Sequence, residues 1–203
     1  MRNSHTTAGQ TEVSIDLAGC LVQVEASRAW FSRRVLPLSV EQLRWRPGPQ
    51  RWSIAECLDH LNITLGFYLP KIDKTIQVGW RQRSTSQENG RYLQSEIEAL
   101  RVVEPPVTVR HEAARSLYPA IAVDPDCLVD DFHQTRDRYV DLVRRAFGLD
   151  LPRIMIGEPL HPFLRTLGGT LAFIAAHDRR HMWQAEQVRH KPQFPRAVFA
   201  AQE

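Results

Sequence analysis

Three histidines carry the strongest chemical pattern in this sequence. His177 and His181 are four residues apart in a stretch of helical periodicity, so both imidazoles would project from one helix face, one turn apart. Two imidazoles placed in this way can bind one metal ion. His60 belongs to an earlier helical stretch and could meet the other two in a helical bundle. Three ligands from two helices would leave coordination positions open for water or substrate, which is typical of a catalytic metal site.

Simpler interpretations of the same residues remain open. With 8 histidines among 203 residues, a chance pair at this spacing is not rare, and His60 could be an ordinary core histidine. A zincin-type protease is excluded, because its motif needs glutamate directly after the first histidine and Asp178 stands there. Gln184 follows His181 by three residues on the same face. It could orient a ligand imidazole or a bound water, or it could simply pack or be solvated.

The charged residues near the histidines have mainly structural interpretations. Glu56 is expected to cap its helix, with a role beside His60 as the alternative. Asp178 is expected at the surface or as the partner in an interhelix salt bridge, with Arg179 or Arg180 nearby. A basic edge is formed by Arg179, Arg180, Arg189, His190 and Lys191. Such an edge is typical of a solvated face, although it could attract a carboxylate substrate or an acidic thiol.

A few other side chains could border a site. Trp52 and Tyr139 are candidates for the mouth of a pocket, against the simpler interpretation that they fill the core. His133 is expected at the boundary of the bundle. The three cysteines are widely spaced and form no CxxC motif, so they predict small core residues rather than a redox pair or a zinc ribbon.

Helical periodicity predicts the elements that must position these residues. Four long helices are expected over residues 13–36, 53–69, 125–147 and 170–190. The second begins with the capping box Ser53-Ile-Ala-Glu56 and is expected to kink or break at Pro70. The start of the last helix is ambiguous between Pro162 and Thr170, and the shorter helix capped by Thr170 is preferred.

These elements predict an all-α protein, an antiparallel four-helix bundle with a long irregular excursion between its second and third helices. The excursion covers residues 79–123 and holds one short helical turn near residues 92–100. The bundle domain is expected to span residues 13–190, between a flexible N-terminal tail over residues 1–12 and a C-terminal tail over residues 191–203.

Composition limits the classes of function. Apolar residues make up 43% and charged residues 24% of the chain, which is ordinary for a globular protein. No apolar run approaches the ~20 residues of a membrane span, and no secretory signal opens the chain. A cytoplasmic protein with no membrane partner is therefore expected. The net charge of +3 is too small to predict a specific nucleic-acid partner.

Two segments resemble the signatures of a known family. The segment Trp52-Ser-Ile-Ala-Glu-Cys-Leu-Asp-His60-Leu resembles the second-helix signature of the DinB-like superfamily. The segment His177-Asp-Arg-Arg-His181-Met-Trp-Gln184 resembles the signature of its last helix. The resemblance covers roughly residues 13–190 and implies a four-helix bundle with an unusual helix connection. It also implies a divalent metal, often zinc or nickel, on three histidines, which match His60, His177 and His181.

The resemblance indicates a function class without fixing the reaction. Relatives include thiol-dependent S-transferases, a mycothiol-dependent maleylpyruvate isomerase and proteins described as metal-dependent hydrolases. We therefore expect an enzyme that activates a water or an external low-molecular-weight thiol toward a small-molecule substrate. The alternatives are a non-catalytic, stress-associated protein with a structural ion and, more remotely, a DNA-binding protein. Helix faces of a bundle of this size could also pair two copies as a homodimer.

Overall fold

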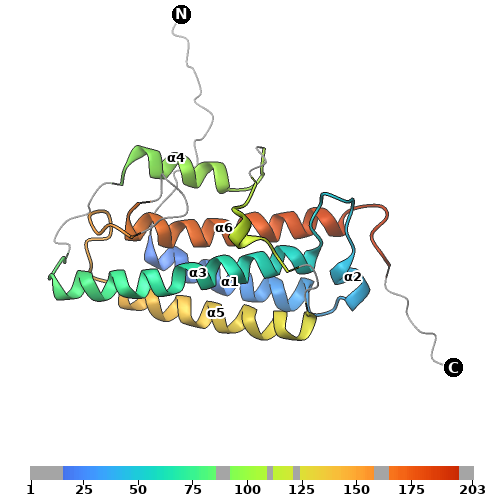
Figure 1. Ribbon diagram of the computed structural model, residues 1–203, viewed down its shortest axis with the longest axis horizontal. Coiled ribbons are helices and arrows are strands. Elements are labelled where there is room, and N and C mark those ends of the chain that lie inside the picture. Colours follow the sequence, from blue (N-terminus) through green and yellow to red (C-terminus); the bar gives the residue numbers. More distant parts are fainter. Residues whose placement is uncertain (1–15, 86–91, 109–111, 121–123, 158–164, 197–203) are drawn as a thin grey trace, which may run out of the picture.

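The computed structural model describes residues 16–85, 92–108, 112–120, 124–157 and 165–196 (Figure 1). Within these residues the regular elements are helices, and the extended pairing is confined to two isolated bridges, Thr85 with Leu149 and Met155 with Thr166. The elements are α1 (Leu17–Arg34), α2 (Val40–Arg44), α3 (Ile54–Arg81), α4 (Gln94–Val103), the 3-10 turn η1 (Arg115–Leu117), α5 (Pro125–Arg145) and α6 (Leu167–Arg189). The expected all-α class is confirmed. No helix among the described residues has the length and apolar character to cross a bilayer.

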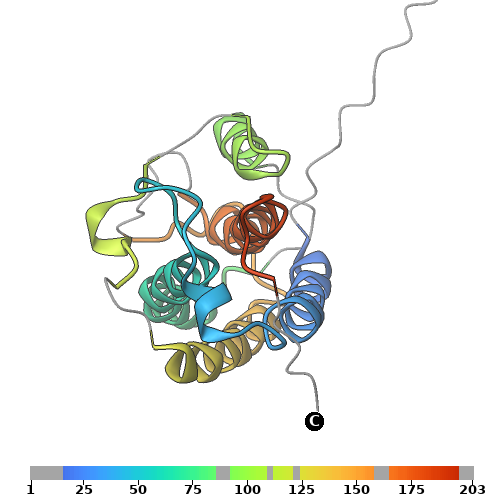
Figure 2. The ribbon, with the colours of Figure 1, turned by 90° about the vertical axis from the view of Figure 1, so that its right-hand side faces the viewer.

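The four long helices α1, α3, α5 and α6 lie side by side as a bundle, and α4 packs outside it on α6 (Figure 2). The expected antiparallel arrangement is correct for α1 against α3 and for α5 against α6. It is wrong for α3 against α5 and for α1 against α6, because in each pair the N-terminal halves of both helices lie at the same end of the bundle (Figure 1). The chain between α3 and α5 must therefore travel back along the bundle, which explains its length.

The expected capping box at the start of α3 is confirmed. The Ser53 hydroxyl accepts from the Glu56 backbone N–H at 3.2 Å, and the Glu56 carboxylate accepts from the Ser53 N–H at 2.8 Å. The expected break at Pro70 is wrong, since α3 continues through it to Arg81. Pro70 and Gly66, whose carbonyl loses its hydrogen bond to the proline, are both exposed. Water can therefore satisfy that carbonyl, and the helix persists.

The start of α6 also differs from the preferred sequence interpretation. Thr166, and not Thr170, is the N-cap: its hydroxyl accepts from the Gly169 N–H at 3.0 Å. The Pro162 alternative is wrong too, because α6 begins at Leu167, although Pro162 itself lies outside the described residues. Glu96 of α4 fixes this start by accepting from the backbone N–H groups of Arg165 and Thr166. A Cβ on Gly169 would lie 2.5 Å from the Glu96 carboxylate, so the glycine permits this approach.

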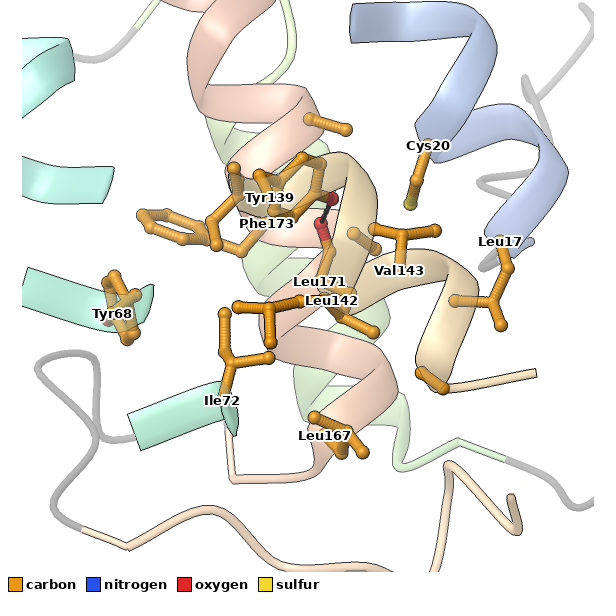
Figure 3. Packing of buried hydrophobic residues seen from close by; sticks show 14 of the residues in the cluster. Leu17, Cys20, Tyr68, Ile72, Tyr139, Leu142, Val143, Leu167, Leu171 and Phe173 are labelled. Carbon is orange, nitrogen blue, oxygen red and sulfur yellow. Dashed lines mark hydrogen bonds between the residues drawn. The ribbon is translucent and has the colours of Figure 1, made fainter. Parts of the chain in front are cut away.

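The interior consists of two apolar clusters separated by polar side chains. The larger cluster joins the N-terminal halves of α1 and α6 to the C-terminal halves of α3 and α5; Figure 3 shows Tyr68 of α3 and Phe173 of α6 within it. The smaller cluster occupies the opposite end, around Phe31, Leu58 and Phe132. Between the two lies what we call the polar layer, made of buried side chains from all four long helices: Ser27, His60, Asn62, Thr64, Arg136, Asp178 and His181.

The predicted tails are only partly described. Residues 1–12 lie outside the described residues. Of the C-terminal stretch, residues 191–196 are described, and they form turns that return toward α2, where the Gln42 side chain donates to the Pro195 carbonyl at 2.9 Å.

Candidate metal centre

The three predicted histidines meet at the polar layer, to which His60 and His181 belong and beside which the partly buried His177 lies. Nε2 of His60 on α3 lies 3.2 Å from Nε2 of His177 on α6, and Nε2 of His181 lies 3.1 Å from the same atom. One ring nitrogen from each of the three residues lies within 4.8 Å of the others, and the group could hold a metal ion. His60 is a buried, hydrogen-bonded histidine, and its ring also faces the α6 pair.

The chemistry of the three rings fits a cation between them. The Nδ1–H of His60 donates to the Leu117 carbonyl at 2.7 Å, so Nε2 of this ring carries a bare lone pair. His177 Nε2 faces two nitrogens and has at most one hydrogen, so it cannot donate a full hydrogen bond along both contacts. A tetrahedral ion with Zn–N distances of ~2.0–2.1 Å holds its nitrogens about 3.3 Å apart, close to the separations of His177 Nε2 from the other two rings.

The surroundings hold all three imidazoles in their neutral, metal-binding form. Burial lowers the pKa of His60, and the hydrogen bond to Leu117 only partly opposes this. Burial holds the pKa of His177 and of His181 well below the usual value, and the neighbouring imidazoles and the Arg180 guanidinium add to the effect. Neutral imidazole is the ligand form, so no proton must be displaced near neutral pH.

Aromatic rings border the three histidines. The Trp52 ring centroid lies 4.8 Å from that of His60 and 5.9 Å from that of His181, so its predicted place beside a site is supported. The Tyr118 ring packs against the Trp52 ring in a T-shaped contact, with centroids 6.2 Å apart. Phe173 stacks on His177 at 5.2 Å. Tyr139, the second candidate for a pocket mouth, is instead fully buried in the core, where its hydroxyl donates to the Leu171 carbonyl (Figure 3).

The segment after α4 covers His60 from outside the bundle. Leu117 of η1 is buried and provides the carbonyl that holds the His60 ring. The backbone N–H of Ala120 donates to the Asp59 carboxylate at 2.7 Å, which fastens the same segment to α3. The excursion predicted from sequence is therefore part of the centre. No sequence signal marked Leu117, because its role depends on a main-chain carbonyl.

Asp178 is buried and forms an interhelix ion pair, as one of the two sequence interpretations expected, and its partner is Arg136. Its carboxylate accepts from the Arg136 guanidinium of α5 at 2.8 Å and from the Ser27 hydroxyl of α1 at 3.0 Å. Arg136 also donates to the Asn62 side chain of α3 at 3.0 Å. The sequence indicated an interhelix ion pair for Asp178 but did not indicate Arg136 as its partner. The available signal was that Arg136 continues the apolar stripe of α5 four residues after Phe132.

The remaining sequence candidates have structural roles or border the site. Glu56 pairs with Arg46 and caps α3 as expected. Arg179 donates to Glu104 and Gln23, and Arg189 to Glu186, so much of the basic edge is neutralised within the protein. His133 is half-buried against aromatic rings of the smaller cluster, as a boundary residue. Gln184 lies beside His181 and raises its pKa slightly, while His181 Nδ1 is buried without a well-formed hydrogen bond.

Comparison with known proteins identifies the family. A family model described as the DinB superfamily matches residues 23–185, a stretch that contains all three histidines and Gln184. No curated protein and no solved structure matches the chain. The family model spans most of the sequence and its fold agrees with the helical bundle seen here. The chain therefore belongs to the DinB superfamily.

Proposed function

We propose that the protein is a metal-dependent enzyme that activates a water or an external thiol toward a small-molecule substrate, as a hydrolase or a thiol S-transferase. The divalent ion, zinc or nickel, would be held by His60, His177 and His181. The observation that carries this proposal is the convergence of one nitrogen from each histidine within 4.8 Å, with no fourth protein ligand in the group among the described residues. Three ligands leave room for an exogenous one.

The donor set supports this chemistry. Three neutral imidazoles add no negative charge, so a bound ion would keep its full charge and lower the pKa of a water or thiol beside it. The Leu117 carbonyl orients the His60 ring, and Gln184, near His181, would orient the ring of His181. Asp178 is excluded as a general base, because Arg136 and Ser27 occupy its carboxylate.

The cysteines of the chain favour an external nucleophile. Cys20 and Cys57 are buried, and burial raises the pKa of both thiols. Cys127 is exposed on α5, and its Sγ interacts with the nearby Asp124 carboxylate. None of the three belongs to the histidine group. A thiolate at the site would therefore come from a separate thiol molecule. Free cysteines also accord with the proposed cytoplasmic location.

The competing functions receive less support. A structural ion would be expected where the core is insufficient, yet apolar clusters fill both ends of this bundle. A specific nucleic-acid partner would need a contiguous basic surface, whereas Arg179 and Arg189 are engaged by carboxylates. A homodimer formed through helix faces is compatible with the proposal and is not required by it.

The decisive experiment starts from protein purified without an affinity tag. Elemental analysis should find close to one divalent ion per chain, and the protein restored with that ion should transfer a thiol to an electrophile or hydrolyse an ester or amide. Absence of any stoichiometric ion after reconstitution with zinc and with nickel would refute the proposal. A bound ion with no response to any added ligand would assign it to the structural alternative.

A further inference from the structure

One threonine of the polar layer has a hydroxyl without a partner. Three helical threonines among the described residues donate to the carbonyl four residues earlier: Thr75 to Lys71 at 2.7 Å, Thr135 to Asp131 at 2.7 Å and Thr170 to Thr166 at 2.9 Å. This is the common way for a helical threonine to satisfy its hydroxyl. Thr64 of α3 differs, because its Oγ1 is buried and has no hydrogen-bond partner.

Thr64 lies beside the three histidines. It follows His60 by one turn on the same face of α3, and Tyr68 follows it by another turn. His60 contacts His177 of α6, and the Tyr68 ring packs against Phe173 at 6.0 Å, with Phe173 one turn before His177. Thr64 therefore lies on α3 between these two contacts, at the level where Phe173 stacks on His177. Only 3% of its surface is exposed.

The unpartnered hydroxyl is costly unless something binds it. A buried hydroxyl without a hydrogen bond destabilises a fold, and valine has the same shape without the polar atom. The hydroxyl can both donate and accept, so it suits a water as well as a thiolate. Nearby, the Tyr68 and Phe173 rings pack on each other, and Phe173 also stacks on His177.

We propose that the Thr64 hydroxyl is the hydrogen-bond partner of the water or thiol that enters the three-histidine site. This inference rests on the proposed function and names a residue of that site which neither the histidine motif nor the family match marks. Thr64 would contact the exogenous ligand directly, whereas the histidines would hold the ion. Removing the hydroxyl should therefore weaken the binding of the exogenous ligand and leave the binding of the metal ion unchanged.

The test uses the full chain loaded with cobalt(II), whose visible spectrum reports added ligands. The variants are Thr64→Val, which removes the hydroxyl at constant shape, and Thr64→Ser, which keeps it. Thr75→Val in the same helix is the matched control, because it removes a hydroxyl that already has a partner. The probe is 2-mercaptoethanol, titrated at constant pH, and cobalt affinity and the melting temperature of the metal-free protein are measured for each variant.

We expect Thr64→Val to bind cobalt within about threefold of wild type and to bind 2-mercaptoethanol about tenfold more weakly, the size of a hydrogen bond to a charged group. Thr64→Ser should retain the thiol affinity within about threefold, and Thr75→Val should not change it. The metal-free Thr64→Val protein should melt about 2–4 °C higher than wild type, whereas Thr75→Val should not.

The outcomes separate this inference from the function on which it rests. Equal thiol affinity in wild type and Thr64→Val overturns the role of Thr64 alone. The same weakening in Thr75→Val would also overturn it, because the effect would not be specific to the site. A wild-type cobalt spectrum that ignores 2-mercaptoethanol overturns the proposed function and the inference together.

Discussion

Removing the carboxylate of Asp178 should be among the most damaging single changes in the bundle. Its partner Arg136 has 0% of its surface exposed, and the Asp178 carboxylate, 2.8 Å away, neutralises the charge of the Arg136 guanidinium. Asp178→Leu would leave the guanidinium with only neutral acceptors, which are the Asn62 side chain, the Phe132 carbonyl and the Thr135 hydroxyl. The loss of one partner of a buried ion pair costs about 3–5 kcal/mol.

This loss of free energy of unfolding corresponds to a large decrease in melting temperature. For a chain of this length each kcal/mol lowers the melting temperature by about 2–4 °C, so Asp178→Leu should lower it by about 6–20 °C. The double variant Asp178→Leu with Arg136→Met should recover most of the loss, because apolar side chains of similar volume replace a buried pair at little net cost. The free energy of unfolding in urea gives the coupling between the two sites directly.

The control for this cycle is Ser27→Ala. The single hydrogen of the Ser27 hydroxyl is shared between the Asp178 carboxylate and the Gln23 carbonyl, so its removal should cost only about 1 kcal/mol. The reasoning fails if Asp178→Leu costs less than about 1 kcal/mol, or if the double variant is no more stable than the single one. Either result would mean that the Arg136 guanidinium reaches water in solution.

Other predictions concern the histidines and the charge of the molecule. Replacing any one of His60, His177 or His181 by alanine should weaken zinc binding at least 100-fold in a competition titration with a chelator dye, because each supplies one ligand. Chelation should leave the far-UV helical signal intact, since apolar clusters support both ends of the bundle. The metal-free protein should lose stability as the pH falls below about 6.5, by up to about 1.4 kcal/mol per pH unit for each histidine. In that range the histidines of the unfolded chain bind protons, whereas burial lowers the pKa of the imidazoles in the folded protein. The free energy of unfolding measured in urea should therefore decline from pH 7.5 to pH 6.5 and again to pH 5.5. A free energy of unfolding that does not change with pH would contradict this prediction. Binding to duplex DNA should be weak and should vanish at 200 mM salt, as gel-shift titrations would show.

Local sequence patterns predicted the parts of the structure that depend on local contacts. The capping box at Ser53 needs only residues 53–56, and the shared face of His177 and His181 needs only one helical turn. The start of α6 could not be found in this way, because Thr166 is fixed by Glu96, a residue 70 positions away. The partner of Asp178 lies on another helix, at Arg136, and no neighbouring residue indicates it.

The directions of the helices were harder to predict than their existence. Apolar periodicity indicates which face of a helix is buried and is silent about the direction in which the helix runs. The parallel placement of α3 and α5 follows from the smaller cluster, which joins Leu58 of α3 to Phe132 of α5. The His60 ring was predicted to meet α6, and that required only that the two helices be neighbours.

The connection between α3 and α5 separates the residues that could hold the ion, on the long helices, from the residues that lie over them, on the connection. Because the two helices run in the same direction, some chain must cross the length of the bundle, whatever its sequence. That crossing carries the Leu117 carbonyl and Tyr118 over the histidines, while the ligands themselves lie on the long helices. Substitutions and changes of length in the crossing can thus alter what reaches the histidines without disturbing the four-helix core.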